Sequence, residues 1–519
     1  MEALKLTSDH VRNMVENGRD IYLVDFSEKY LEELLGKYDL SDRLAGVLLD
    51  IDNRISKDIK RGGQRASFGG KDLPVYSYQS ISELEDASFL ILNDYFNETY
   101  DKLSQWIKRE EKPAIYYYAN EETEIDLYYR KKYQDEPLGN LILFRSGPHA
   151  SSYVKGMDFA DNARALFEYM LSKHFDEKYE LVWLVKDPQE YALYEKEGRV
   201  SFLSYDWAVS EKEEERDCYY RALCLAKYIF FTDAYGFARN SRHDQIRVQL
   251  WHGCGFKTRV NFVRCEKRYE YTTVISELYA KIHQDIYGLR EEQVLVTGYG
   301  KQDWLFHPHR EAWEALCIPR ADKYIFWLPT FRMAKTGLEK LNEYDLTGQT
   351  GLPVVNTPER LQELDKLLGD LNTLLIIKLH PFQDQERLMK INMEHVVLLE
   401  HERLVEKDVQ INQLLGLGDG LISDYSSAAV DYLLLDKPIG FTLEDMKEYE
   451  ESRGFVFDNI REWLPGAELF TFTDLCSFVR EIGLGIDRTK EKRRRLKSIM
   501  HKYDDDQSCR RITEALGID

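Results

Sequence analysis

Residues 249–258 read QLWHGCGFKT, and the rest of the chain is interpreted outward from this stretch. The four residues before it are interpreted as the last part of a buried strand, so His252 would lie at a strand-to-loop junction. Histidine is the side chain best suited to move protons near neutral pH. Gly253 permits a sharp turn or a close approach to a ligand, and Lys257 can face a phosphate as a point charge. A single histidine after a strand is more often structural, so the hypothesis of a site depends on two further clusters.

Both clusters repeat the pattern of a strand followed by a polar turn. The apolar run at 374–377 predicts a buried strand, and Pro381 then places His380 near the carboxyl end of that strand. Residues 420–427 read GLISDYSS and predict a strand, a tight turn and the start of a helix. Ser426 and Ser427 there can offer hydroxyl and backbone N–H groups to an anion, and simple helix capping is the alternative. Ligands of open α/β sheets bind at the carboxyl ends of strands, so we expect one shared site.

These stretches resemble the CDP-glycerol:poly(glycerophosphate) glycerophosphotransferase family, which includes the teichoic-acid primases and polymerases. The matching segments follow the family's order from about residue 141: WHG at 251–253 with Lys257, TGY at 297–299 with Asp303, PTFR at 329–332, KLHP at 378–381, SDYSS at 423–427 and RGFVFD at 453–458. The chain departs from the family pattern in two places. Cys254 and Gly255 replace the usual small residue and Pro after WHG, and Gly300 and Lys301 replace the usual Pro-Arg after TGY. These departures bear on the donor, the acceptor or the polyol more than on the reaction class.

The resemblance implies an α/β fold with a GT-B-like pair of Rossmann-like domains facing a cleft. The expected domains are an acceptor-side domain at 140–308, a CDP-donor domain at 309–485 and a basic C-terminal helix at 486–519. Alternating strands and helices in residues 1–135 predict a further small α/β domain. Because the glycine-rich turn of a dinucleotide site is absent there, we interpret it as a Rossmann-like accessory domain for docking or protein contact.

Two segments are predicted to lack regular structure. Glycine-rich residues 61–71 predict a flexible loop, and the charged and polar residues 128–139 predict a linker between the first and second domains.

The implied function is transfer of a polyol phosphate, glycerol phosphate first, from CDP-glycerol or CDP-ribitol to a hydroxyl of a cell-wall or capsule polymer, with release of CMP. His252 and His380 are the expected catalytic residues, with His252 as the general base. The expected donor-binding residues are Gly253, Lys257, Thr330, Arg332, Ser423, Asp424, Ser426, Ser427 and Asp431. Asp431 is expected to hold the ribose hydroxyls, and an ordinary helix charge is its alternative. No acidic metal cluster is evident in the sequence, so neither a metal nor a cofactor is expected.

Two other functions stay open at this point. A GT-B glycosyltransferase would use a nucleotide sugar, and attack would fall on a sugar carbon rather than on phosphorus. A non-catalytic nucleotide-binding assembly protein would bind nucleotide without turnover, and the presence of both His252 and His380 argues against it.

The composition of the chain limits which partners and which cellular location we expect. The net charge of −21 argues against general nucleic-acid binding, which needs a basic surface. No apolar run approaches the roughly 18–20 residues that span a bilayer, and the N-terminal residues lack a signal-peptide core. Seven scattered cysteines fit a reducing compartment. We therefore expect a cytoplasmic protein that is peripheral at the inner face of the cell membrane and acts on a lipid-linked or polysaccharide acceptor.

Residues 488–502 concentrate seven Lys and Arg besides Arg488 in an otherwise acidic chain. Leu496, Ile499, Met500 and Tyr503 fall on one helical face, which is the pattern of a basic amphipathic helix lying on an anionic leaflet. The alternative is a terminal helix that packs back across the two halves with its charges solvated.

Overall fold

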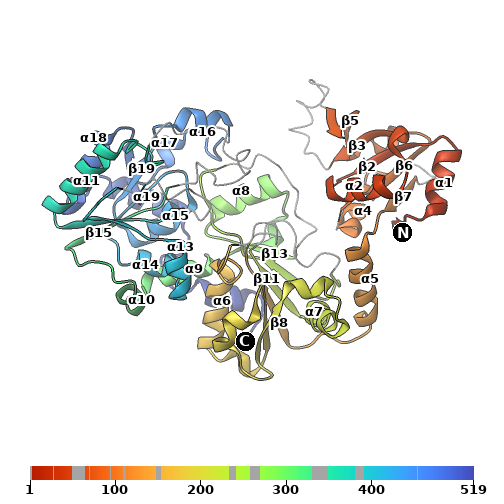
Figure 1. The fold of residues 1–519 in the computed structure, drawn as a ribbon, viewed down its shortest axis with the longest axis horizontal. Helices are drawn as coiled ribbons and strands as arrows, with labels where there is room; N and C mark the ends of the chain where they lie inside the picture. The colour runs from red at the N-terminus through yellow and green to blue at the C-terminus, as the bar shows by residue number, and fades with distance from the viewer. Residues whose placement is uncertain are drawn as a thin grey trace.

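The computed structural model describes residues 3–26, 28–49, 65–68, 71–93, 95–108, 113–147, 154–232, 241–257, 269–329, 349–379, 388, 391–452 and 454–519. Its strands form three sheets, two of seven strands and one of six, which follow one another along the chain (Figure 1). Thr330, Arg332 and His380 lie outside the described residues, so their predicted positions stay predictions.

The first sheet is parallel except at one edge, in the order β1-β7-β6-β2-β3-β5-β4. Its strands are β1 (Leu4–Lys5), β2 (Asp20–Val24), β3 (Leu44–Leu49), β4 (Arg65–Phe68), β5 (Lys71–Ser77), β6 (Ala87–Ile91) and β7 (Ala114–Tyr117). Its helices are α1 (Ser8–Glu16), α2 (Glu28–Lys37), α4 (Phe96–Ser104) and α5 (Glu121–Tyr133). The predicted loop at 61–71 is wrong for 65–68 and for Lys71, because β4 pairs antiparallel with β5. The glycines that predicted a loop flank this short edge strand rather than interrupt it.

The predicted linker at 128–139 is also wrong over its first part, because α5 continues to Tyr133. Tyr129 and Tyr133 are buried, and the ring of Tyr129 stacks on Tyr220 of α7 (Glu213–Leu225) with the ring centroids 4.7 Å apart. The hydroxyl of Tyr133 donates to the Asp217 carboxylate of α7 at 2.7 Å. We call the parts of the chain built on the three sheets the first, second and third units. These contacts join the first unit to the second, and α5 lies between the two (Figure 1).

The second and third sheets are parallel throughout, in the orders β10-β9-β8-β11-β12-β13-β14 and β17-β16-β15-β18-β19-β20. In each, the chain moves outward from its first strand and then returns to build the other side, as in doubly wound sheets. The strands are β8 (Leu141–Arg145), β9 (Glu180–Val185), β10 (Val200–Ser204), β11 (Tyr228–Phe231), β12 (Ile246–Gln249), β13 (Tyr271–Val274), β14 (Val294–Val296), β15 (Lys323–Trp327), β16 (Thr373–Ile377), β17 (Val396–Leu398), β18 (Gly420–Ser423), β19 (Ile439–Thr442) and β20 (Ala467–Leu469).

Helices cover these two sheets, which explains why strands such as β9, β11 and β16 are mostly apolar. The helices are α6 (Asp161–Ser172), α7 (Glu213–Leu225), α8 (Glu277–Tyr287), α9 (Gly300–Phe306), α10 (Arg310–Ala315), α11 (Pro358–Asp370), α13 (His401–Glu406), α14 (Asn412–Leu415), α15 (Ser427–Tyr432), α16 (Met446–Ser452), α17 (Ile460–Trp463), α18 (Phe472–Gly483), α19 (Lys490–Met500) and α20 (Ser508–Ala515). All five residues of β16 are buried, in agreement with the strand predicted at 374–377.

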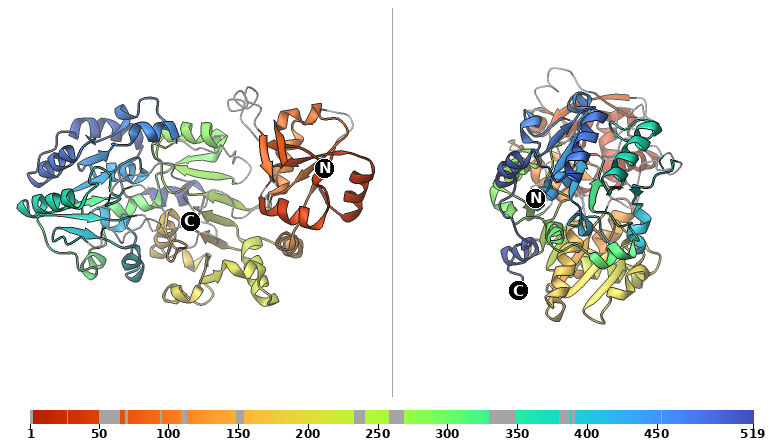
Figure 2. Two further views of the ribbon diagram at one scale, coloured as in Figure 1. Left: turned by 45° about the horizontal axis from the view of Figure 1, so that its top comes forward. Right: turned by 90° about the vertical axis from the view of Figure 1, so that its left-hand side faces the viewer.

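The end of the chain returns from the third unit to the second. The carboxylate of Asp303 in α9 accepts from the backbone N–H groups of Ser508 and Cys509, each at 2.8 Å, at the start of α20. Ile512 of α20 is fully buried in the core that also contains Ile142 of β8. The C-terminus consequently lies beside α6 (Figure 1 and the left view of Figure 2). This is the crossing that the alternative interpretation of the terminal segment predicts.

The basic helix α19 packs its apolar face against protein. Leu496 and Met500 are buried, and Arg493 is fully buried between the carboxylates of Asp436 and Asp487, at 3.0 and 2.6 Å. The apolar stripe is therefore mostly covered, although Ile499 remains exposed. Contact between this helix and a membrane stays a prediction.

His501, directly after α19, is expected to make stability depend on pH. Its ring is buried, Nε2 donates to the carbonyl of Val430 at 2.8 Å, and burial lowers its pKa to about 4. The unfolded chain binds this proton near pH 6.5, so the free energy of unfolding falls as the pH drops through 6.5 toward 4, by roughly 2 kcal/mol at pH 5. Urea unfolding at pH 7.5 and pH 5 should show a smaller acid loss for His501→Gln than for the wild type. An equal loss in both proteins would contradict the assignment.

Candidate functional site

His252 lies three residues after the last residue of β12, at the carboxyl end of the second sheet as predicted. Its Nδ1 lies 2.8 Å from Oδ2 of Asp161, the first residue of α6, and its side chain is 55% exposed. An ionised carboxylate can only accept, so Nδ1 carries the proton and Nε2 is left with a lone pair. The pair has the arrangement of a general base held by a second group.

Asp161 is a candidate site residue that was not assigned from the sequence. Its backbone has φ of +60°, an uncommon conformation for a residue with a side chain, and it begins α6. The available signal was the Asp161-Asn162 pair immediately before an apolar helix. Nothing in one sequence pairs that position with His252, which lies 91 residues away.

Asn162 holds the backbone of the loop that follows β12 and carries His252, which we call the histidine loop. Its side-chain amide donates to the carbonyls of Leu250 and Trp251, at 3.1 and 2.7 Å, and is buried. Trp251 has φ of +52°, so this backbone is strained and needs such support. The two adjacent residues of α6 therefore hold the side chain of His252 and the backbone before it.

Lys301 of α9 contacts both members of the His252–Asp161 pair. Its Nζ is 3.2 Å from Oδ1 of Asp161 and also donates to the carbonyl of His252. Burial alone would raise the pKa of the Asp161 carboxyl, but Lys301 and the hydrogen bond from His252 outweigh burial and lower it. Asp161 is consequently held ionised.

The loop after His252 touches the third unit at the start of α15. Gly253 has φ of +147°, and a Cβ there would lie 2.7 Å from Oγ of Ser427. A Cβ on Gly255 would also face Ser427, but at an ordinary 3.4 Å. Farther along, Lys257 forms an isolated antiparallel bridge with Phe455. Three predicted site residues, His252, Gly253 and Ser427, are thus brought together from two sheets.

Gly253→Ala is expected to lower turnover about tenfold or more, because the added methyl group must displace either the histidine loop or Ser427. Gly255→Ala is the matched control on the same loop and should stay within about threefold of wild type, since its Cβ meets ordinary contact distances. The test is to measure the steady-state turnover of the wild type and of the two variants. Equal losses in the two variants would contradict a special role for the close approach of Gly253 to Ser427.

Three further predicted donor residues lie in the last part of β18 and in the turn that follows it. Ser423 and Asp424 are fully buried, and the hydroxyl of Ser423 donates to the carbonyl of Leu328 at 3.3 Å. The side chain of Ser426 accepts from the backbone N–H of Ala428, so it makes the helix cap that the sequence analysis kept as an alternative. Contact between these residues and a donor stays a prediction.

Asp431 is 1% exposed and already has partners. Oδ1 accepts from the side-chain amide of Gln302 at 2.7 Å, and Oδ2 lies 3.5 Å from Nζ of Lys301. Burial raises the pKa of this carboxyl, and both partners oppose that rise. The predicted ribose contact is untested, and a ribose hydroxyl would have to reach a carboxylate that is almost fully buried.

Cys254 has the surroundings of a packing residue. It is buried, its Sγ lies 3.0 Å from the hydroxyl of Tyr299, and burial raises the pKa of its thiol to about 12. A thiol with such a pKa carries almost no thiolate near neutral pH and is a poor nucleophile.

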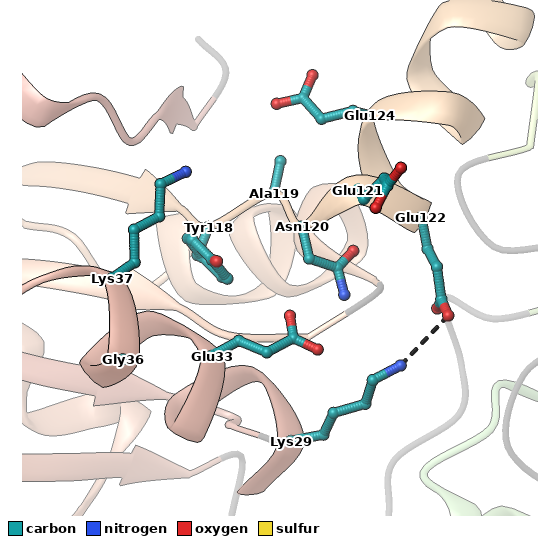
Figure 3. Close-up of a pocket in the computed structure, with 10 residues that line it drawn as sticks. All are labelled: Lys29, Glu33, Gly36, Lys37, Tyr118, Ala119, Asn120, Glu121, Glu122 and Glu124. Atoms are coloured by element: carbon teal, nitrogen blue, oxygen red, sulfur yellow. Dashed lines mark hydrogen bonds and ion pairs between the residues drawn. The ribbon is translucent and has the colours of Figure 1, made fainter.

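A separate hollow of about 780 Å³ lies in the first unit, between α2 and the start of α5 (Figure 3). Lys29 and Glu122 face each other across it at 3.3 Å, and Lys37 lies 5.9 Å from the ring centroid of Tyr118. None of the predicted site residues lines it. Its charges are mixed, and the geometry assigns it no ligand.

Two negative findings hold for the residues that the structure describes. No group of three or more His, Cys, Asp or Glu is arranged to hold a metal ion within those ranges. None of the helices described is both long and apolar enough to cross a bilayer.

Comparison with known proteins gives a consistent family. The model of the CDP-glycerol:poly(glycerophosphate) glycerophosphotransferase family matches residues 139–517. The teichoic acid ribitol-phosphate polymerase TarK of Staphylococcus aureus is 26% identical over 289 residues, which are 51% of this chain and 53% of that relative. The teichoic acid glycerol-phosphate transferase of the same species is 24% identical, with 73% of this chain and 93% of the relative covered. The chain spans about half the length of the first curated relatives, 53% and 56%.

Among solved structures, the wall teichoic acid polymerase TagF superposes with a TM-score of 0.57 at 19% identity, over 76% of this chain and 93% of that one. At this low identity the superposition shows a shared fold alone. The family match covers residues 139–517, most of the chain and every motif segment quoted above. The chain therefore belongs to the CDP-glycerol:poly(glycerophosphate) glycerophosphotransferase family.

Proposed function

We propose that the chain transfers a polyol phosphate, glycerol phosphate first, from a CDP-polyol to a hydroxyl of a wall or capsule polymer and releases CMP. Membership of the family supports the reaction class. The observation that carries the proposal is the exposed imidazole of His252, held through Nδ1 by Asp161 in a loop that contacts Ser427. A residue that only supported the fold would not need an exposed, oriented Nε2.

The proposed architecture is a GT-B-like pair of Rossmann-like domains, at 140–308 and 309–485, preceded by an accessory domain at 1–135 and followed by the segment 486–519. Two parallel sheets with doubly wound strand order support it, together with the contact between their strand-end loops. The return of α20 to the second unit supports treating the last segment as a structural crossing.

In the proposed mechanism, Nε2 of His252 removes the proton from the acceptor hydroxyl as its oxygen attacks the β-phosphorus of the donor. The new phosphorus–oxygen bond forms while the bond from that phosphorus to the bridging oxygen breaks, and CMP leaves with the electron pair. Asp161 fixes the orientation of the imidazole and stabilises the imidazolium that forms. Positioning and electrostatics then supply most of the remaining rate enhancement, as is usual in phosphoryl transfer.

The donor diphosphate is proposed to bind the loops of the third unit. Arg332 would grip it with its guanidinium fork, and His380 would offset the charge that builds on it. Ser426, Ser427 and Lys257 would complete the pocket from the two loops that touch. Thr330, Ser423 and Asp424 would support those loops, and Asp431 would act through Lys301.

Products from a panel of donors test the function. Purified protein would be incubated with CDP-glycerol, CDP-ribitol and UDP-sugars, each with and without a polyol-phosphate primer, and the products identified by mass spectrometry. Release of CMP with a mass increment of one polyol phosphate on the primer supports the proposal. Turnover of UDP-sugars alone would favour a glycosyltransferase, and nucleotide binding without turnover would favour an assembly protein.

The proposed location is the inner membrane face, through a lipid-linked acceptor and the exposed cations of α19. Arg494 and Arg495 are exposed, whereas Arg493 is buried, so a charge reversal must spare Arg493. Arg494→Glu with Arg495→Glu should reduce sedimentation with anionic vesicles at low salt and leave activity on a soluble primer intact. Unchanged sedimentation would leave α19 as a structural helix alone.

A further inference from the structure

We infer that Lys301 is a positioning residue for this reaction, because it links the His252–Asp161 pair of the second unit to Asp431 in α15 of the third unit. The inference rests on the proposed function and deepens it. The orientation of the His252 imidazole by Asp161 then depends on Lys301, and the position of Lys301 depends on its ion pair with Asp431.

The geometry places one ammonium group among three acceptors from three elements. Nζ of Lys301 donates to the carbonyl of His252 and forms ion pairs with Oδ1 of Asp161 at 3.2 Å and with Oδ2 of Asp431 at 3.5 Å, the last without hydrogen-bond geometry. The side chain of Lys301 is only 10% exposed, so water competes little for these bonds. Asp161 comes from α6 and Asp431 from α15, and Lys301 stands between them on α9.

The bonds of Lys301 act on both ends of the base. Through the carbonyl of His252 it fixes the backbone that carries the imidazole, and through Asp161 it fixes the carboxylate that orients the ring. A Cβ on Gly253 would lie 3.7 Å from the same Nζ, so the turn after His252 also packs on this side chain. Loss of the ammonium would therefore remove two constraints on the imidazole, one on its backbone and one on the carboxylate that orients it.

Charge balance gives Lys301 a second effect. It faces the carboxylates of Asp161 and Asp431, and it lies near the thiol of Cys254 and the backbone carbonyl of His252. Burial would lower the pKa of Lys301, but the two carboxylates outweigh burial and raise it, so the ammonium stays charged. Without it the pKa of Asp161 would rise, and a protonated Asp161 could no longer accept from Nδ1 as an anion.

Gln302, the next residue of α9, makes the link to the third unit specific. Its amide holds Oδ1 of Asp431 at 2.7 Å, which leaves Oδ2 for Lys301. An ammonium is a compact point charge with three donors, whereas a guanidinium is a planar fork, so we expect Lys301→Arg to restore the charge and only part of the geometry.

The test compares wild type, Lys301→Met and Lys301→Arg by CMP release from a CDP-polyol over pH 5 to 9. We expect Lys301→Met to lower kcat on the order of 100-fold, with the donor KM changed by less than about threefold, because misplacement of the base affects the chemical step. The pH below which kcat falls should move upward in Lys301→Met and return toward the wild-type value in Lys301→Arg. Wild-type kcat and an unchanged pH profile in Lys301→Met would overturn the inference.

A second readout does not depend on turnover. Proton NMR of the wild type should show a downfield Nδ1 proton from His252, which is assigned by its absence in His252→Gln, and Lys301→Met should lose it. If the wild type releases no CMP from any CDP-polyol, the proposed function fails while this signal still decides the role of Lys301. A signal that persists unchanged in Lys301→Met overturns that role.

Folding is controlled with a charge-matched variant. Lys301→Met leaves the buried Asp431 carboxylate without its cation, so the double variant Lys301→Met with Asp431→Asn removes that unpaired charge. If the single variant does not unfold cooperatively in urea, the double variant takes its place. Its kcat, pH profile and Nδ1 signal are then judged by the same two outcomes.

Discussion

His252→Ala should reduce turnover by roughly 100-fold or more while leaving donor affinity and the midpoint of urea unfolding close to wild type. The imidazole is 55% exposed and packs little, so its removal creates no cavity in a core. What is lost is the lone pair of Nε2, which Asp161 holds in place through the 2.8 Å contact to Nδ1. Affinity for a CDP-polyol is measured by calorimetry and turnover by CMP release.

Two further variants make this result specific. Asp161→Asn keeps the size of the side chain but replaces its acceptor carboxylate, so turnover should fall less than in His252→Ala and the acid limb of its pH profile should change. His307→Ala removes another exposed histidine that pairs with an aspartate, Asp506, outside the site, and should retain wild-type turnover. Wild-type turnover in His252→Ala would exclude His252 as the base.

The sequence predicted the three strands that lead into the site, because parallel strands buried on both faces are often continuous apolar runs. The run at 374–377 became β16, and GLISDYSS became β18, its turn and the start of α15. The sequence also placed His252 and Ser427 at strand ends, and the structure brings their loops into contact. This part of the site followed from local patterns combined with one topological rule.

The interactions that hold the site could not be predicted in this way. Asp161 reaches His252 across 91 residues, and Lys301 joins residues from α6 and α15, so neither pairing leaves a trace in local periodicity. The same limit explains the error at α5. Its charged composition suggested a linker, whereas tertiary contacts bury Tyr129 and Tyr133 against α7.

The stability of the C-terminal crossing should depend strongly on one arginine. Arg493 is fully buried and donates to the carboxylates of Asp436 and Asp487 and to the backbone carbonyl of Asp436 at 2.9 Å. Burial would raise the pKa of both carboxyls, but Arg493 helps to outweigh it and lower them. Removing one partner of a buried ionic group typically costs about 3–5 kcal/mol, because the partners left behind remain desolvated. We therefore expect Arg493→Met to lower the apparent free energy of unfolding in urea by about 3 kcal/mol.

Arg494 is the matched control, because it belongs to the same helix and also binds Asp436, at 2.6 Å, but is 60% exposed. Water solvates both ends of that pair, so Arg494→Met should cost less than about 1 kcal/mol. The contrast between adjacent arginines separates burial from charge, since each variant removes one positive charge from α19. Losses of equal size would mean that the enclosed position of Arg493 contributes nothing beyond its charge, and the proposed role of α19 as the anchor of the crossing would then be wrong.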